Sequence, residues 1–253
     1  MSGSSTVRRE GDSAQAAGAA DEAAPLRFVS AASLFDGHDA AINIIRRLLQ
    51  AHGAEVVHLG HNRSVADIVR AALQEDADGI AISSYQGGHM EFFRYMVDML
   101  RENGAPHIRV FGGGGGTITP EEIDELQAYG VERIYHPRDG MQMGLVGMIE
   151  DLVRRTAERR APASRPERIA IDDEIAVAQM VSAIEEGLFN DAELARLRKE
   201  WQLRAGQVPV VGITGTGGAG KSSFTDELLA RLLRQFPQRR IAVLAVDPTR
   251  RRT

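Results

Sequence analysis

Residues 26–49 read LRFVSAASLFDGHDAAINIIRRLL. The stretch opens with a short apolar run, passes through a polar loop, and continues with apolar residues spaced three or four positions apart. The first pattern is typical of a strand buried within a sheet, and the second of a helix that packs on one. We expect a strand at 26–32 and, after the loop, a helix whose sheet-facing residues are Ala41, Ile45, Leu48 and Leu49.

The same strand and helix pattern repeats along the chain. Apolar runs of strand length alternate with segments of helical length, as in a parallel sheet covered on both faces by crossover helices. This predicts a flavodoxin-like (Rossmann-like), doubly wound α/β domain over residues 25–157. Residues 119–122, TPEE, predict a helix start with a capping box. The remaining strands are expected at 55–60, 79–84, 107–112 and 133–136.

The chain outside this domain divides into three expected segments. Residues 1–24 are rich in Ala, Ser and Gly, carry acidic residues and lack an apolar stretch, which predicts a disordered tail and argues against a targeting signal. Residues 158–206 are expected to form a linker with helices, and residues 207–253 the start of another α/β domain. The helices are expected near 172–187 and 191–204, and the strands of the last segment at 208–214 and 240–246.

Composition excludes several classes of protein. The chain of 253 residues has no cysteine, so disulfides and thiolate chemistry are absent. A net charge of -5 argues against nucleic acid as a main partner. No stretch reaches the roughly 18 apolar residues that a membrane span requires. We therefore expect a soluble, cytoplasmic protein that binds neither nucleic acid nor a membrane.

Polar and glycine-rich loops follow three of the expected strands. Ligands of an open parallel sheet bind at the carboxyl ends of its strands, so these loops should meet at one ligand-binding edge. An imidazole at His38 is a good metal ligand, and the Asp36 carboxylate can accept its second ring proton. The residues assigned to this edge are Asp36, Gly37, His38, Ser83, Tyr85, Gly113 and Gly114.

Each of these features also has a simpler interpretation. The glycine run at 112–116 allows a bulky ligand to approach the sheet, but a flexible linker has the same composition. His38 taken alone is more often an ordinary histidine of a surface loop. The same interpretation applies to His52, His58, His61 and His89.

A second motif, GTGGAGKS, occupies residues 215–222 and fits the phosphate-binding loop G-x-x-x-x-G-K-[ST] in full. Its glycines let backbone N–H groups surround phosphate oxygens, and Lys221 adds a positive charge at the β and γ positions, the catalytic role we assign here. The motif does not distinguish ATP from GTP. The residues assigned to the nucleotide are Gly215, Gly217, Gly218, Ala219, Gly220, Lys221, Ser222 and Ser223.

Two residues are candidates for holding Mg²⁺ beside the nucleotide. The Ser222 hydroxyl has the position of the metal-ligating residue of the motif. Asp247, at the end of the expected strand 240–246, either reaches the metal through water or starts a turn with Pro248. The residues alone leave both possibilities open for Asp247.

The first set of residues resembles a known signature. Asp36-x-His38, Ser83 and Gly113-Gly114 are similar to the D-x-H-x-x-G, S-x-L, G-G pattern of the cobalamin-binding domains of methylmalonyl-CoA mutase, glutamate mutase and methionine synthase. The resemblance implies that His38 is the lower axial ligand of cobalt, that Asp36 hydrogen-bonds His38, and that the nucleotide tail of the cofactor inserts beside Ser83 and the glycine pair. Ala41 and Tyr85 depart from the family's glycine and leucine, and Tyr85 suggests a different wall to the tail pocket.

The order of the modules resembles the fused isobutyryl-CoA mutases, as do LFDGHDAAINIIRRLLQ at 34–50, SSYQGGHMEFF at 83–93 and VDPTRRRT at 246–253. The resemblance implies an adenosylcobalamin-dependent radical isomerase that interconverts isobutyryl-CoA and n-butyryl-CoA. It also implies a GTPase chaperone domain that hydrolyses GTP with Mg²⁺ and gates cofactor loading. The sequence holds no acyl-CoA site, so we expect this segment to bind cofactor without turning over substrate. A phosphate-binding-loop domain needs several more strands to bury its sheet, so we expect the chain to be the N-terminal part of a longer protein. We also expect a homodimer.

Other functions remain open. A cobalamin carrier or sensor with a nucleotide-driven switch would share both motifs without mutase activity. A receiver-type signalling domain would share the fold, but it expects an acidic residue after the third strand, where this chain has Ser83 and Ser84. The phosphate-binding loop could also serve ATP-dependent adenosylation of cobalamin.

Overall fold

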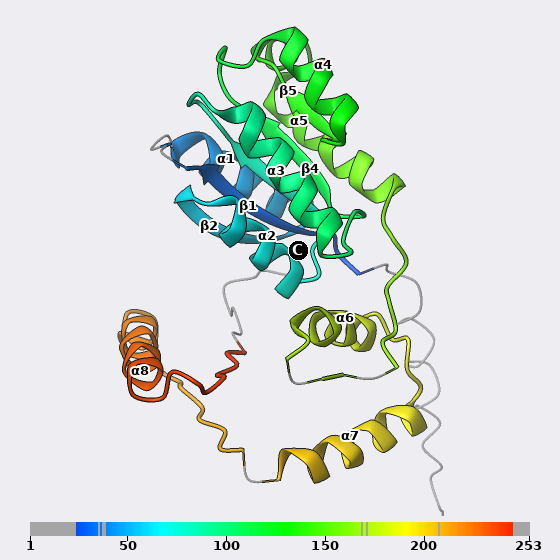
Figure 1. Cartoon of the computed structure of the whole chain (residues 1–253), viewed down its shortest axis with the longest axis vertical. Helices are drawn as coiled ribbons and strands as arrows, with labels where there is room; N and C mark the ends of the chain where they lie inside the picture. Colours follow the sequence, from blue (N-terminus) through cyan, green and yellow to red (C-terminus); the bar gives the residue numbers. More distant parts are fainter. Residues whose placement is uncertain are drawn as a thin grey trace, which may run out of the picture. The chain divides into compact units, whose positions relative to one another are not determined.

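The computed structural model describes residues 24–34, 36, 39–167, 169–170, 172–206 and 208–244. They fall into two compact units, which divide between Asp191 and Ala192. The first unit contains a 5-stranded parallel sheet of order β2-β1-β3-β4-β5, seen in Figure 1. This order confirms the flavodoxin-like prediction. The strands are β1 (Arg27–Ser33), β2 (Glu55–Arg63), β3 (Gly79–Ser83), β4 (Arg109–Gly113) and β5 (Arg133–Tyr135).

Helices cover both faces of the sheet. Because successive strand residues point to opposite faces, Val29 joins one apolar cluster and its neighbour Phe28 the other. The first cluster lies under α2 (Val65–Gln74), α3 (His89–Glu102) and α4 (Pro120–Tyr129). The second lies under α1 (Asp39–Ala51) and α5 (Pro137–Glu158). The sheet is therefore doubly wound, as its sequence pattern predicts.

Local caps determine where several helices begin. The predicted capping box of α4 is present: Thr119 Oγ1 accepts from the Glu122 amide, and the Glu122 carboxylate accepts from the Thr119 amide. α5 begins in the same way, with His136 at its N-cap and Asp139 completing the box. Gly144, at φ 69° and ψ 169°, interrupts α5 after its first turns.

The first unit ends with an extra helix. After α5 the described residues from Ala161 to Glu167 contain no helix or strand, and α6 (Glu174–Glu185) follows. α6 contacts α2. The expected tail at 1–24 lies outside the described residues except for Ala24, whose carbonyl oxygen accepts a hydrogen bond from Arg160 at 2.7 Å.

The second unit consists of α7 (Asp191–Ala205), a loop that carries the phosphate-binding motif, and α8 (Lys221–Gln235). The strand predictions here are wrong for the described residues: 208–214 and 241–244 carry no strand. Two short strands bury too little apolar surface to be stable without further neighbours. Accordingly Val210 and Leu244 are both 93% exposed.

No helix among the described residues has the length and apolar character needed to cross a membrane.

Candidate functional site

The carboxyl edge of the sheet brings Asp36 next to the loop after β3. Asp36 is 1% exposed, and its Oδ2 accepts a hydrogen bond from the Tyr85 amide at 2.8 Å. A buried carboxylate held by a backbone N–H is fixed in position, so it can orient a neighbouring imidazole. Gly37 and His38 lie outside the described residues, so the geometry of the predicted Asp36–His38 pair is untested.

The ends of β1 and β3 are joined beneath this carboxylate. The Ser33 hydroxyl donates to the Ser84 hydroxyl at 3.1 Å, and both side chains are buried. Ser83, one of the predicted site residues, is the last residue of β3 and is 3% exposed. The predicted residues of the β1 and β3 loops therefore do meet at one edge.

The glycine run at the end of β4 packs directly against the loop after β3. A Cβ at Gly114 would lie 1.4 Å from the Ser84 carbonyl oxygen, so only glycine allows this approach. A Cβ at Gly112 would clash with the rings and methyl groups of Phe93 and Ile134. At Gly113 the nearest atom would be the Tyr135 carbonyl oxygen, at an ordinary 3.5 Å. Part of the glycine run is thus needed for packing within the edge itself.

An apolar slot opens between α1 and α5 beside these loops. Its cavity measures about 30 Å³, and its lining is almost entirely hydrocarbon. Its lining is chemically suited to a flat, apolar ring and includes Gly112, but 30 Å³ is about the volume of one water molecule, so a ring enters only if α1 and α5 move apart. The buried carboxylate, the glycine edge and this apolar lining are the features that would receive a cobalamin. The slot is lined by Ile42, Ile45, Ala81, Ile82, Phe111, Gly112, Tyr135, Leu145, Met148, Ile149 and Leu152.

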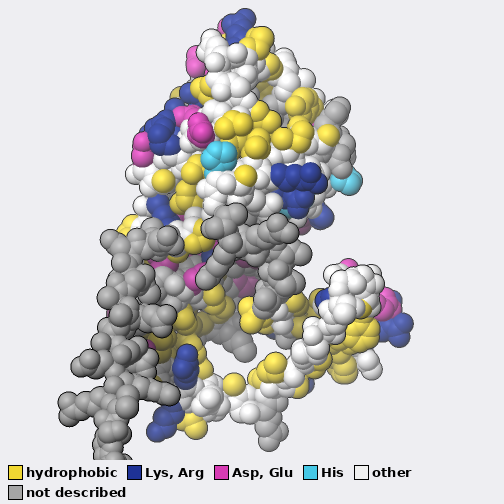
Figure 2. Space-filling view, turned by 180° about the vertical axis from the view of Figure 1, so that it is seen from behind, with side chains coloured by type: hydrophobic (Ala, Val, Ile, Leu, Met, Phe, Trp, Pro, Cys, Tyr) yellow, Lys and Arg dark blue, Asp and Glu magenta, His cyan; other side chains and the backbone are white. Residues whose placement is uncertain are grey.

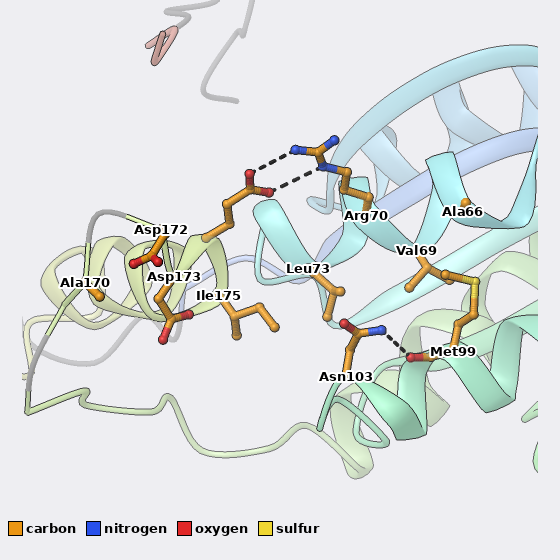
Figure 3. A pocket seen from close by; sticks show the side chains of 11 residues that line it. Ala66, Val69, Arg70, Leu73, Met99, Asn103, Ala170, Asp172, Asp173 and Ile175 are labelled. Carbon is orange, nitrogen blue, oxygen red and sulfur yellow. Dashed lines mark hydrogen bonds and ion pairs between the residues drawn. The ribbon is translucent and has the colours of Figure 1, made fainter. Parts of the chain in front are cut away.

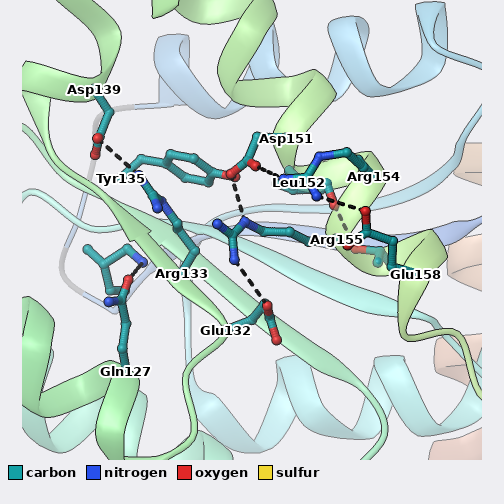
Figure 4. A network of polar contacts seen from close by, with 12 residues as sticks. Gln127, Glu132, Arg133, Tyr135, Asp139, Asp151, Leu152, Arg154, Arg155 and Glu158 are labelled. Carbon is teal, nitrogen blue, oxygen red and sulfur yellow. Dashed lines mark hydrogen bonds and ion pairs between the residues drawn. The ribbon is translucent and has the colours of Figure 1, made fainter. Parts of the chain in front are cut away.

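Tyr135 forms one wall of the slot and is held by a polar network, shown in Figure 4. Its hydroxyl donates to Asp151 Oδ2 at 3.0 Å, and the same oxygen accepts from Arg155 Nε at 2.8 Å. Burial, reinforced by the neighbouring Asp151 carboxylate, raises the pKa of Tyr135 above its ordinary value. The phenol therefore stays protonated and connects β5 to α5.

The side of the first unit seen in Figure 2 carries hydrophobic side chains gathered near its upper end. In the first part of α5, on either side of Gly144, the exposed hydrophobic residues are Met141, Met143, Leu145 and Val146.

Three of the other histidines, His52, His58 and His89, lie close to hydrogen-bonding or charged groups of the first unit. His52 Nδ1 lies 2.8 Å from the Leu48 carbonyl oxygen, and His58 Nδ1 lies 2.9 Å from the Ser30 hydroxyl. His89 is 7% exposed, and its Nε2 lies 3.1 Å from Glu122. Among the described residues no group of three or more His, Asp or Glu side chains could hold a metal ion.

Sequence reasoning missed the contact between His89 and Glu122, which joins the start of α3 to the start of α4. It also missed Tyr135 and the α5 residues of the slot. The available signal was the place of Tyr135 at the end of a strand, where side chains line a ligand edge. The partner on α5 has no local signature in the sequence.

In the second unit, the phosphate-binding loop runs directly into α8. Gly218 and Gly220 have φ of 76° and 79°, a left-handed conformation that lets successive backbone N–H groups curve around an anion. Gly220 is the N-cap of α8, so Lys221, Ser222 and Ser223 form its first turn. The Lys221 ammonium donates to the carbonyl oxygens of Gly215 and Thr216 at 2.8 and 2.9 Å. Asp247 lies outside the described residues.

Comparison with known protein families assigns a family model to each of two parts of the chain. Residues 26–145 match the family model of the B12 binding domain, and residues 177–253 match that of the methylmalonyl Co-A mutase-associated GTPase MeaB. A fused isobutyryl-CoA mutase of Cupriavidus metallidurans is 58% identical over 232 residues, covering 90% of this chain and 21% of the relative. The chain is related to the fused isobutyryl-CoA mutases.

Other relatives agree with this assignment. The fused isobutyryl-CoA mutase of Geobacillus kaustophilus is 54% identical over 90% of this chain and 22% of its own length. The pivalyl-CoA mutase small subunit of Xanthobacter autotrophicus is 35% identical over 45% of this chain and 74% of its length. The chain thus spans about a fifth of the length of the fused mutases it matches. The two family-model matches confirm the predicted B12-binding and GTPase domains.

Proposed function

We propose that this chain is the cofactor-loading part of an adenosylcobalamin-dependent acyl-CoA mutase that interconverts isobutyryl-CoA and n-butyryl-CoA. GTP hydrolysis at the phosphate-binding loop, with Mg²⁺, gates the loading and release of the cofactor. The observation that carries the proposal is the joint presence of the Asp36 edge, with its apolar slot, and the phosphate-binding loop in one fused-mutase chain. We propose the same domain limits as above, a cytoplasmic location and a homodimer.

The residues of the first unit hold the cofactor in this proposal. The cofactor would supply radical chemistry to the site. His38 would hold cobalt through one ring nitrogen, and Asp36 would accept the proton on the other, which would fix the tautomer. Ser83, Tyr85 and the Gly113–Gly114 backbone lie beside the cofactor tail in this proposal. The slot excludes water from the tail of the cofactor.

The residues of the second unit act on the nucleotide. The backbone N–H groups of residues 215–220 and the start of α8 favour the negative charge of phosphates. Lys221 must leave the carbonyl oxygens of Gly215 and Thr216, or share its donors with them, to reach the β and γ phosphates. Ser222 is the proposed Mg²⁺ ligand, and Asp247 a second, water-mediated one. Guanine is proposed over adenine because the family match is to a GTPase.

The axial ligand of cobalt tests the first half of the proposal. The protein is prepared with nitrogen-15 histidine, loaded with cob(II)alamin, and examined by electron paramagnetic resonance. A histidine ligand, with nuclear spin one half, splits each cobalt line into a doublet, and His38→Ala removes this splitting. His61→Ala serves as the control because His61 is exposed on the neighbouring β2. A triplet from the cofactor's own benzimidazole contradicts the role of His38 and favours a cobalamin carrier or sensor.

A further inference from the structure

The helix α6 lies against the amino-terminal edge of the sheet, at the opposite end of the strands from the ligand edge. Three arginines of the first unit reach its carboxylates: Arg27 pairs with Glu185, Arg160 with Glu186 and Arg70 with Glu174, each at 2.9 Å. Figure 3 draws the Arg70 pair at the start of α6. α6 is thus held at both of its ends.

Two of these arginines are also fixed to the body of the unit. Arg27 bonds Glu55 at 3.1 Å and the Glu75 carbonyl oxygen at 2.7 Å. Arg160 bonds Asp78 at 3.0 Å and the Ala24 carbonyl oxygen at 2.7 Å. Because a guanidinium is planar and rigid, the hydrogen bonds of each arginine to the body of the unit fix the direction of its remaining N–H groups, which point to the carboxylates of Glu185 and Glu186. We call Arg27 and Arg160, with their partners Glu185 and Glu186, the arginine clamp.

The three pairs differ in their exposure to water. The Arg27 and Arg160 side chains are 18% and 24% exposed, whereas Arg70 is 68% exposed. Among the carboxylates, Glu186 is 25% exposed, Glu174 41% and Glu185 48%, so Arg160–Glu186 is the best shielded of the three pairs. Exposed pairs contribute little because solvent and salt screen them. The clamp, and not the Arg70 pair, should therefore provide most of the electrostatic attachment of α6.

The apolar contact of α6 is thin by comparison. Its buried side chains are small apart from Met180: Ala176, Ala178, Ser182 and Ala183. A cavity of about 590 Å³ separates its first turn from α2 and α3, and one of about 210 Å³ lies between its other end and the sheet edge. Because apolar burial is interrupted at both places, charge supplies an unusually large share of the attachment.

We propose that the amino-terminal edge of the sheet is a releasable docking surface for α6, and that the arginine clamp controls the docking. The match to the GTPase family begins at residue 177, inside α6, so the helix belongs to both modules. The docked helix is then the path by which the nucleotide site influences cobalamin binding at the far edge. This last step rests on the proposed function.

Hydrogen exchange of this chain, followed by mass spectrometry, tests the docking. In the double variant Arg27→Gln/Arg160→Gln, amides of residues 176–186 should exchange at least 10-fold faster, because a released helix of this length is unstable in water. Wild-type protein at about 1 M salt should show a smaller change, since partly buried pairs are screened much less than exposed ones. Peptides of β1, β3 and β4 should be unchanged in both cases.

The control is Arg154→Gln, which removes an exposed arginine that pairs with Asp151 and Glu158 within α5. It should leave the exchange of α6 at the wild-type rate. Docking by the clamp is overturned if α6 stays equally protected in the double variant, or if wild-type α6 already exchanges as fast as exposed α7.

The coupling is tested in the full-length protein by titrating cobalamin with and without a non-hydrolysable GTP analogue. The analogue should change the cobalamin Kd at least 5-fold in wild type and less than 2-fold in the double variant. Cobalamin binding and GTP hydrolysis measured separately should stay within 3-fold. The proposed role of α6 in coupling is overturned if the analogue changes the cobalamin Kd equally in both proteins. It is also overturned if wild type binds cobalamin and hydrolyses GTP but shows no effect of the analogue. If wild type lacks cobalamin binding or GTP hydrolysis, the proposed function is refuted, whereas the hydrogen-exchange result on α6 docking is unaffected.

Discussion

At the scale of single residues, Gly114 and Asp36 show how closely the ligand edge is packed. The Gly114 backbone lies against the Ser84 carbonyl, while the Ser84 hydroxyl bonds Ser33 and the neighbouring Tyr85 amide bonds Asp36. The Gly114 contact is between backbone atoms, which cannot move aside as a flexible side chain can, so a change there is passed to the Ser84 and Tyr85 contacts.

We expect Gly114→Ala to destabilise the first unit by about 1–3 kcal/mol or to prevent its folding, because the added Cβ overlaps the Ser84 carbonyl oxygen. Urea denaturation followed by far-ultraviolet circular dichroism measures the free energy of unfolding. Gly116→Ala is the matched control, since a Cβ there meets no atom within 4 Å, and it should change stability by less than about 0.5 kcal/mol. Equal stability of the two variants would contradict the packing described here.

At the scale of elements, α5 is attached to the sheet by charge as well as by apolar contact. Glu132, just before β5, has a side chain that is only 4% exposed. Its carboxylate lies 3.5 Å from Arg155 of α5 and 2.7 Å from Arg159, the C-cap residue of the same helix. One turn before Arg155, Asp151 binds Tyr135 (Figure 4). These contacts hold the second half of α5, while Gly144 separates it from the first turns.

Tyr135→Phe tests this attachment. At pH 7 it should cost about 1 kcal/mol, the typical value of one hydrogen bond, because Asp151 keeps its pair with Arg155. The raised pKa of Tyr135 stabilises the folded state fully below about pH 10, the ordinary pKa of tyrosine, and this contribution is lost as the pH rises further.

The free energy of unfolding should therefore fall less steeply above pH 10 in Tyr135→Phe than in wild type. Urea denaturation at a series of pH values from 7 to 11 gives both slopes. Tyr95→Phe, at a side chain 55% exposed, is the control for loss of a phenol. A Tyr135→Phe protein with the wild-type slope would show that the phenol titrates equally in the folded and unfolded chain.

At the scale of the whole molecule, the division into two units predicts that the two sites can be disabled separately. Lys221 bonds only carbonyl oxygens of its own loop among the contacts described, so its removal should leave the first unit intact. Lys221→Ala should weaken binding of GTP with Mg²⁺ about 100-fold, or roughly 2.7 kcal/mol. Isothermal titration calorimetry measures this affinity.

Two measurements accompany the Lys221 experiment. Lys199→Ala removes an exposed lysine of α7 and should bind GTP as wild type does. The thermal unfolding of the first unit should be the same in all three proteins. GTP affinity within 3-fold of wild type in Lys221→Ala would contradict the assignment of this loop as the nucleotide site.

The sequence by itself determined the features that depend on neighbouring residues. Its apolar periodicity gave five parallel strands and their helices, TPEE gave the capping box of α4, and GTGGAGKS gave the loop before α8. Periodicity, caps and turns act within a few residues, so they can be read along the chain. Periodicity alone failed at 208–214, where a strand also needs a partner.

The tertiary structure alone decided which distant residues meet. Ser33 and Ser84 are 51 positions apart, and Arg27 and Glu185 are 158 apart. No local pattern selects one such partner among many similar residues. The choice follows from strand order and from the face each helix covers, because these bring segments together and leave room for only some side chains. The meeting of the β1 and β3 loops at one edge was therefore predictable from the sequence, and the arginine clamp was not.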